Sequence, residues 1–229
     1  MKTLLLLSLL TAYQSSGHLI SSDTSFTPDA AVRIEPDPAC VKIRATQEDF
    51  RTSEEKRKLN NCVQSKVETG SLNGVTYQIH YTDGSGSFAG QSGLPPNDFG
   101  QWGTRWRVSC RKDAMTDRGS CFMYLRDLWV FVNADGKATL SIGSEHYPGS
   151  DVMLRVDKRV PVIMNTRLLK GSFNLLDSQK LIAELSRAKT ITTRYRKWPN
   201  NHDRDDMWEE IVGFNEALQY LKWAVARIK

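Results

Sequence analysis

Several residue patterns that catalytic and cofactor sites require are missing from the sequence. Its 229 residues include 4 cysteines and 4 histidines, and no two cysteines have the C-x-x-C spacing of zinc sites. The Gly-x-Ser-x-Gly turn of serine hydrolases is absent, because the glycine-rich segment 84–90 fails that spacing. The Gly-x-x-x-x-Gly-Lys-Ser/Thr phosphate loop is absent too. We therefore expect a non-enzymatic protein without a bound cofactor or metal ion.

Beyond its N-terminus, the chain lacks any apolar run long enough to cross a membrane. The one apolar run, residues 4–10, follows Lys2 and is broken by a single serine. Spanning a bilayer takes about 20 apolar residues, whereas a shorter run is typical of the h-region of a signal peptide. Small residues precede His18 at the positions that a signal peptidase reads, so 1–17 is a predicted signal peptide. We expect a periplasmic or secreted mature protein without a transmembrane segment.

Neither sign of charge dominates the chain. It has 31 basic and 26 acidic residues and a formal net charge of +5, and Lys2 would leave with the signal peptide. Lysine and arginine are spread along the sequence instead of forming the basic stripe that nucleic-acid binding favours. This mild basicity permits contact with anionic surfaces but does not require it. We expect a protein or an envelope component as partner, and not nucleic acid.

Four cysteines lie in the predicted mature chain: Cys40, Cys62, Cys110 and Cys121. An even number of cysteines in an exported protein indicates disulfide bonds, and four cysteines allow three connectivities. Proximity along the chain favours Cys40–Cys62 and Cys110–Cys121, each worth roughly 3 kcal/mol in the chain-entropy model. A zinc site is the alternative, which the spacing of the cysteines disfavours.

Segment 18–100 is predicted to be an N-terminal extension of mixed structure. Residues 18–38 are rich in serine, threonine, aspartate and proline, which predicts a flexible lead-in. A helix is predicted over 53–69, because its apolar residues fall on one face and a glycine follows. Residues 75–81 alternate apolar and polar side chains, as a half-buried strand does.

Residues 83–103 form the candidate binding loop. They are rich in glycine, serine and proline, with Phe88, Phe99 and Trp102 among them. Loops of this length are uncommon and are usually functional or disordered. Exposed aromatic side chains often anchor recognition, so binding through these three residues is one hypothesis. A plain linker or a disordered segment is the second hypothesis, and packing of these rings on the sandwich is the third.

Alternating apolar residues after residue 105 predict a series of hairpins. The predicted arms pair 106–110 with 121–125, 128–132 with 138–142, and 152–156 with 160–164. A cysteine lies near the matching end of each arm of the first hairpin, which suits a cross-strand disulfide. Pro161 places the last of these strands towards a sheet edge. A helix near 177–187, a strand over 190–198, a polar loop over 199–206 and a helix starting at Gly213 complete the predicted chain.

Three polar features have a simpler structural explanation than a functional site. His80 and His146 stand on a predicted strand and a predicted turn, with no nucleophile motif in the sequence to use them as a base. The segment 200–206 contains several oxygen ligands that a calcium ion could use, but it does not match the EF-hand pattern. A solvated turn explains its composition. The basic and aromatic run 194–198 suits a solvent-facing strand. No catalytic or metal residue is predicted.

The order of motifs after residue 100 resembles the invasion-associated locus B family of exported bacterial proteins. Trp106-Arg-Val-Ser-Cys110 followed by Cys121-Phe-Met is similar to the family's Trp-x-Val-x-Cys … Cys start. Three later segments of the chain are similar to the family's later strand, late helix and closing motif: Leu154-Arg-Val-Asp157, Leu181-Ile-Ala-Glu-Leu185 and Gly213-Phe-Asn-Glu-Ala-Leu218. The second cysteine pair that the family often carries in its later half is missing here.

The resemblance implies an immunoglobulin-like β-sandwich over 101–229, closed by a C-terminal helix and without known catalysis. We thus expect a mainly β fold with flanking helices, preceded by a disulfide-tied helical extension. The expected function is non-enzymatic binding in the periplasm or at the cell surface, in envelope function or host interaction. The alternative is a periplasmic inhibitor or immunity protein that blocks an enzyme, for which 83–103 would be the inserted loop.

Overall fold

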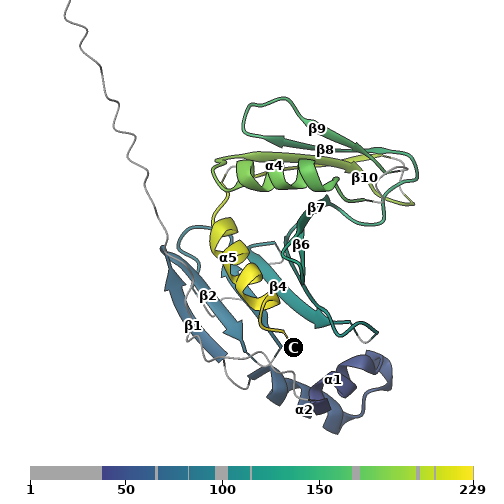
Figure 1. The fold of residues 1–229 in the computed structure, drawn as a ribbon, viewed down its shortest axis with the longest axis vertical. Coiled ribbons are helices and arrows are strands. Elements are labelled where there is room, and N and C mark those ends of the chain that lie inside the picture. Colours follow the sequence, from purple (N-terminus) through teal and green to yellow (C-terminus); the bar gives the residue numbers. More distant parts are fainter. Residues whose placement is uncertain are drawn as a thin grey trace, which may run out of the picture.

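Two antiparallel sheets organise the chain (Figure 1). The computed structural model describes residues 38–64, 67–81, 83–95, 103–113, 115–166, 171–199, 202–208 and 210–228. One sheet has seven strands and the other has four. The protein is mainly β with helices beside its sheets, as the sequence predicts.

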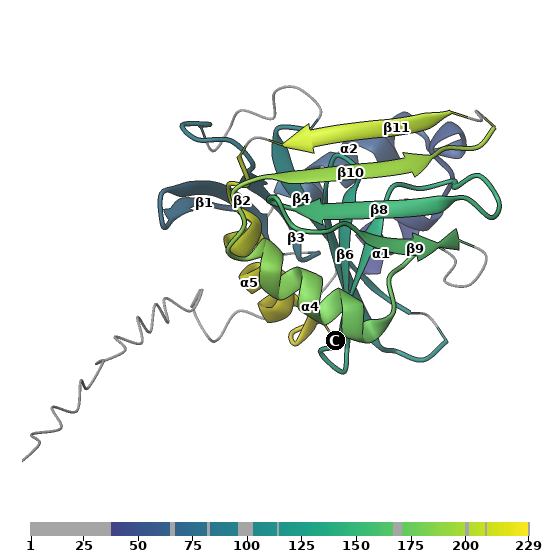
Figure 2. The same ribbon diagram turned by 90° about the horizontal axis from the view of Figure 1, so that it is seen from above.

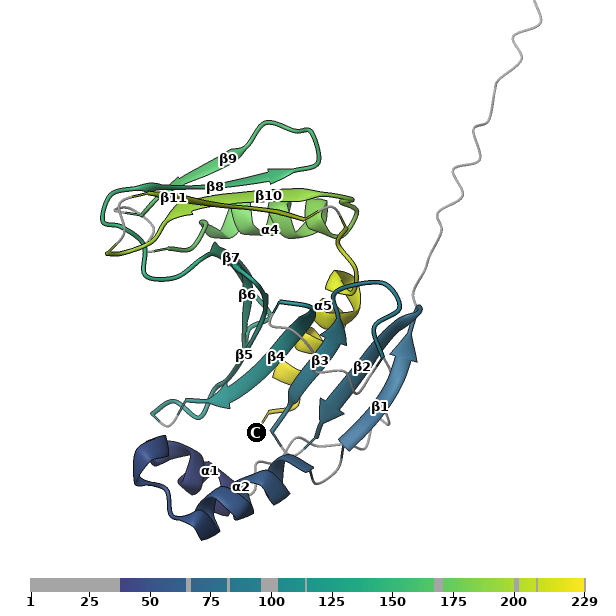
Figure 3. The ribbon, with the colours of Figure 1, turned by 180° about the vertical axis from the view of Figure 1, so that it is seen from behind.

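The seven-stranded sheet is a meander in which each strand pairs with the next along the chain. It curves around helix α5 (Phe214–Val225), as the view from behind shows (Figure 3). Antiparallel neighbours need only short connections, so chain order and spatial order coincide. The strands are β1 (Val67–Leu72), β2 (Val75–His80), β3 (Ser85–Ala89), β4 (Arg105–Lys112), β5 (Gly119–Leu125), β6 (Leu128–Asn133) and β7 (Ala138–Ile142).

The four-stranded sheet has the order β11-β10-β8-β9, and its strands lie side by side in Figure 2. They are β8 (Asp151–Val156), β9 (Val162–Asn165), β10 (Ile191–Arg196) and β11 (Asp203–Trp208). Strand β9 is an edge, which confirms the position predicted from Pro161. Helix α4 (Leu175–Leu185) contacts both β7 and β8, so it joins the two sheets.

Two short helices, α1 (Pro38–Ala45) and α2 (Ser53–Gln64), pack on each other at the N-terminal end of the described chain, with a 3₁₀ turn at Glu48–Phe50 between them. A capping box starts α2, because the Thr52 backbone N–H donates to the Glu55 carboxylate (2.8 Å) and the Glu55 backbone N–H donates to the Thr52 hydroxyl (3.2 Å). Among the described residues, no helix is long and apolar enough to cross a bilayer.

The predicted helix over 53–69 is too long, because β1 begins at Val67. Gly70 lies within β1, opposite Tyr77 in the register. A Cβ atom at Gly70 would lie 2.6 Å from the Tyr77 hydroxyl oxygen, so this glycine makes room for the tyrosine ring instead of ending a helix.

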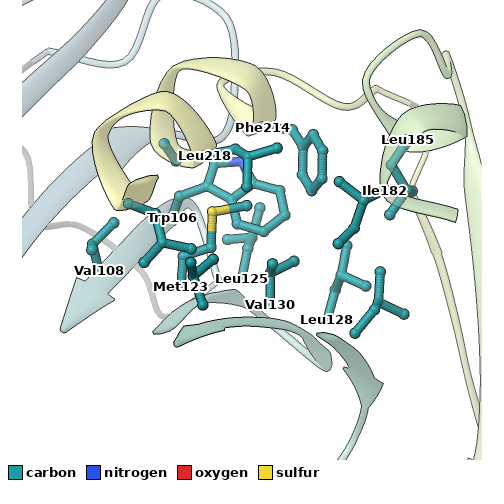
Figure 4. Packing of buried hydrophobic residues seen from close by; sticks show 14 of the residues in the cluster. Trp106, Val108, Met123, Leu125, Leu128, Val130, Ile182, Leu185, Phe214 and Leu218 are labelled. Carbon is teal, nitrogen blue, oxygen red and sulfur yellow. The ribbon is translucent and has the colours of Figure 1, made fainter. Parts of the chain in front are cut away.

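The core lies between the concave face of the seven-stranded sheet and the two later helices (Figure 4). Trp106 of β4 is fully buried and meets the ring of Phe214 edge-on, with 5.4 Å between ring centroids. Its indole N–H donates to the Val212 carbonyl oxygen (2.7 Å), so the one polar atom of this side chain is satisfied. The same buried cluster continues through α4 into the four-stranded sheet.

Two sequence-based expectations differ from the observed topology. The predicted boundary between 18–100 and 101–229 falls between β3 and β4, which pair directly, with Phe88 opposite Trp106. The strands before and after that boundary therefore share one sheet. An immunoglobulin sandwich instead divides its strands between two sheets through Greek-key connections, whereas β1 to β7 run consecutively in a single sheet here.

Candidate functional site

The predicted binding loop 83–103 is partly a strand. Ser85–Ala89 forms β3 between β2 and β4, and Phe88 is fully buried against Tyr220 of α5, with 5.4 Å between ring centroids. Phe88 is therefore a core residue, and its assignment to a binding loop is wrong. Phe99 and Trp102 lie outside the described residues.

The disulfide prediction is confirmed at one of its two pairs. Cys110 of β4 and Cys121 of β5 are opposite each other in the register and are joined by a disulfide. Cys40 is disulfide-bonded as well, whereas the Cys62 side chain lies outside the described residues, so the pairing Cys40–Cys62 stays a prediction.

The polar features of the sequence occupy structural positions. His146 stacks edge-on against Tyr195, and its Nε2 lies 2.6 Å from the Ile142 carbonyl oxygen, while His80 is a partly exposed residue of β2. The segment 200–206, predicted to be a loop, contains most of β11. The part of the chain that the structure describes contains no group of three side chains arranged to hold a metal ion.

A cluster of aromatic side chains lies on the face of the seven-stranded sheet that points away from α5. Alternation places it there, because the residues between its members, such as Met123 and Val130, are fully buried beneath the helix. We call this surface the aromatic face; it consists of Phe122 and Tyr124 of β5 and Trp129 and Phe131 of β6. All four side chains are half-buried.

The rings of the aromatic face contact one another across the two strands. Tyr124 and Trp129 are opposite in the register and stack with 4.4 Å between centroids and 15° between planes. Phe122 and Phe131 form the second opposite pair, at 5.8 Å. Such cross-strand aromatic pairs stabilise a sheet, and together they leave a contiguous apolar patch on the side away from the core.

Two arginines of β4 form a basic rim beside the aromatic face. Arg107 is opposite Tyr124 and Arg111 is opposite Ser120, and both arginine side chains are exposed. Neither forms an ion pair with another described residue. The Cys110–Cys121 disulfide fixes the register of the two strands that carry this rim and half of the aromatic face.

A second feature, which we call the joint pocket, lies where the two sheets meet. It has a volume of about 420 Å³ and is lined by Gly90, Gln91, Ser92, Gly103, Leu125, Arg126, Met207, Trp208 and Glu210. A smaller hollow of about 220 Å³ continues past Arg126 towards Arg204. The pocket thus brings together the end of β3, the β5–β6 turn and the end of β11.

Arg126 is held in the joint pocket by three groups, two from β11 and one from the segment before β4. Its Nη1 lies 3.2 Å from the Asp206 Oδ1, its Nε lies 3.4 Å from the Gly103 carbonyl oxygen, and its guanidinium stacks on Trp208 at 5.5 Å. The other oxygen of Asp206 accepts a hydrogen bond from the Trp208 indole N–H (2.7 Å). These contacts fix the guanidinium plane in one orientation.

Asp127 makes the second polar contact between the sheets. It is buried, it accepts a hydrogen bond from the Tyr195 hydroxyl (3.2 Å), and Arg204 Nε lies 3.3 Å from its Oδ2. Oδ2 of Asp127 accepts no hydrogen bond from a described residue, so its contact with Arg204 is an ion pair without hydrogen-bond geometry. Burial raises the pKa of Asp127 above its usual range, against the opposing effect of Arg204, and burial also raises the pKa of Tyr195 to about 12.

Comparisons with family models, with curated proteins and with solved structures found no match to this chain. Functional assignment therefore rests on the residues and their geometry. The sequence contained a signal for the aromatic face that its motifs did not reveal. Aromatic residues occupy two consecutive outward positions in each of β5 and β6, and the positions between and beside them hold aliphatic and sulfur-containing residues of the core.

Proposed function

We propose that the protein is an exported, non-enzymatic binding protein that recognises a partner protein in the envelope through its aromatic face. The observation that carries this proposal is the contiguous cluster of four half-buried rings beside two exposed arginines. Aromatic residues and arginine are enriched where proteins bind one another, because they supply large contact areas and directional hydrogen bonds.

The chemistry of the surface indicates what the partner offers. The four rings contact one another and form one apolar surface. An apolar patch of the partner can pack against that surface. Arg107 and Arg111 form no ion pair with a described residue, although Arg111 lies near enough to Asp113 to contribute to lowering its pKa. The exposed guanidinium groups suit carboxylates at the rim of that patch. The disulfide and the predicted signal peptide support an oxidising compartment, and the motif order of an exported bacterial family supports an envelope role.

Capture from periplasmic extract by immobilised variants tests this proposal. Trp129→Ser and the double variant Arg107→Glu with Arg111→Glu should each lose the same stoichiometric partner that the unchanged protein captures. The matched controls are Met153→Ser and Arg155→Glu, on the outward face of the four-stranded sheet, and these should retain the partner. A partner that all variants capture equally would contradict the aromatic face as the binding surface.

The identity of the captured partner separates two functional classes. An enzyme whose activity falls on binding would make the protein an inhibitor or immunity protein. A structural envelope protein or a host protein would support a role in adhesion or envelope organisation. Rising salt should weaken either complex, because rim charges are screened over about 8 Å at physiological ionic strength.

A further inference from the structure

The joint pocket carries an inference that goes beyond the aromatic face. From the charges and walls of this pocket we infer that it binds a small zwitterion, an α-amino acid or short peptide with an apolar side chain. Its volume of about 420 Å³ lies within the range of small-molecule sites. It occupies a different part of the molecule from the aromatic face and uses none of the same residues.

The carboxylate of such a ligand has a prepared partner in Arg126. Asp206 and the Gly103 carbonyl oxygen engage Nη1 and Nε, and Nη2 donates no hydrogen bond to any described residue. The Arg126 side chain is about a third exposed, and its guanidinium lies over the Trp208 ring. A planar arginine with spare donors is suited to a carboxylate, which it can bind through two parallel hydrogen bonds.

The ammonium group has a partner in Glu210, which lines the same pocket. The Glu210 carboxylate accepts a hydrogen bond from the Ser92 hydroxyl (2.7 Å) through Oε1, which orients it, and no described residue forms an ion pair with it. A carboxylate can accept several hydrogen bonds, so the remaining sites can take an ammonium group.

The other described residues that line the pocket are mostly apolar residues and glycines. Leu125, Met207 and Trp208 supply apolar side chains, and Gln91 supplies a polar one. Gly90 and Gly103 line the pocket without side chains; a Cβ atom at Gly90 would lie 2.9 Å from a Leu125 methyl carbon. A ligand side chain can therefore lie against leucine and tryptophan while its charged end faces Arg126 and Glu210.

The balance of charge distinguishes a zwitterion from simpler ions. An inorganic anion would meet Glu210 beside Arg126, and a cation would meet Arg126 beside Glu210, so each would face a repulsive neighbour. A ligand carrying both charges satisfies both sides, and neither charge is left unpaired when water is displaced.

Isothermal titration calorimetry with L-phenylalanine, L-leucine and leucyl-leucine tests this inference. At least one should bind at millimolar concentrations or below. For the compound that binds, the amide lacking its carboxylate and the N-acetyl derivative lacking its ammonium group should each bind about tenfold or more weakly, because each loses a charge-assisted hydrogen bond. No heat from any of the three zwitterions, or equal binding by the single-charge analogues, would overturn the inference.

Two variants assign the binding to this pocket. Glu210→Gln keeps the size of the side chain and the acceptor for Ser92, and it should weaken the zwitterion about tenfold. The N-acetyl derivative, which carries only the negative charge, should bind this variant as well as or better than the unchanged protein. Glu54→Gln, at an exposed position of α2, is the control and should change nothing. Unchanged zwitterion affinity in Glu210→Gln would refute the site. Partner capture through the aromatic face should be unaffected by Glu210→Gln, so the two proposals can fail separately.

Discussion

Asp127 is the single residue whose ionisation bears most directly on the contact between the two sheets. Its pKa is raised in the folded protein, mainly by burial, so the folded state holds the proton to higher pH than the unfolded chain. The stabilisation from the protonated carboxyl is complete below the unfolded pKa of about 3.9 and is lost as pH rises through the folded pKa. The four groups acting on it are Tyr195, Arg204, Asp206 and Lys197.

The variant Asp127→Asn removes this titration and keeps an acceptor for the Tyr195 hydroxyl. Its melting temperature relative to the unchanged protein should therefore rise as the pH is raised from about 4 to about 7. Asp135→Asn is the control of opposite sign, because hydrogen bonds from Lys137 lower the pKa of the exposed Asp135. The stabilisation from Asp135 is present above the unfolded pKa of about 3.9 and is lost as the pH falls below it, so this control is followed from about pH 4 downwards. Thermal unfolding followed by circular dichroism measures both. If the difference in melting temperature between Asp127→Asn and the unchanged protein did not vary with pH, the raised pKa of Asp127 would be contradicted.

Residue composition misled the sequence-based prediction at Phe88 for an identifiable reason. The surrounding glycines and serines suggested a loop, but Gly86 lies in β3 beneath α5, where a Cβ atom would be 2.8 Å from the Tyr220 ring. This glycine serves packing and not flexibility. No local pattern reveals that, because Tyr220 is more than a hundred residues away along the chain.

At the scale of elements, the β4–β5 hairpin is where sequence and structure agree most closely. Alternation, turn residues and paired cysteines all indicated the same register, and the structure has Cys110 opposite Cys121. The double variant Cys110→Ser with Cys121→Ser should lower the free energy of unfolding by about 2–4 kcal/mol, because the unfolded chain regains the freedom that the disulfide removes. Urea denaturation measures this loss.

A matched substitution separates the disulfide from the strands themselves. Ser109→Ala, on the outward side of β4 beside Cys110, should change the free energy of unfolding by no more than about 0.5 kcal/mol. If the double cysteine variant were as stable as this control, the disulfide would not contribute to holding the hairpin that carries the basic rim.

Strand β11 was missed because its residues read as a loop. Five of the six, Asp203 to Met207, carry none of the β-branched or aromatic side chains that signal a strand. Its pairing with β10 is supported instead by cross-strand ion pairs, Arg194 with Asp205 (2.6 Å) and Arg196 with Asp203 (3.1 Å). An exposed edge strand can be polar on its outer face, and charged side chains there also disfavour pairing with another molecule. Residues of this composition are recognised as a strand only once their pairing with β10 is known.

At the scale of the whole molecule, the predicted division at residue 100 separates parts that share one core. Beyond the pairing of β3 with β4, α5 depends on the earlier strands: the Tyr220 hydroxyl donates to the Gly84 carbonyl oxygen (3.1 Å), and Gly213 begins the helix against the Ala89 carbonyl. Gly213 has a φ of 75°, which glycine adopts without strain. The sequence motifs after residue 100 predict the strands in which they lie. They do not indicate that α5 packs against the strands before residue 100.

A chain of residues 101–229 alone should therefore fail to fold. It would expose the edge of β4 and the face of α5 that Phe88 covers, and loss of a buried phenylalanine alone costs about 3–5 kcal/mol out of a total stability of about 5–15 kcal/mol. A chain of residues 67–229 keeps every described strand and, among the described elements, loses α1, α2 and the 3₁₀ turn between them, so it should stay folded. Circular dichroism and size-exclusion chromatography distinguish the two. A cooperative thermal transition in the 101–229 chain would show that the later strands form an independent domain and that β1 to β3 merely extend its sheet.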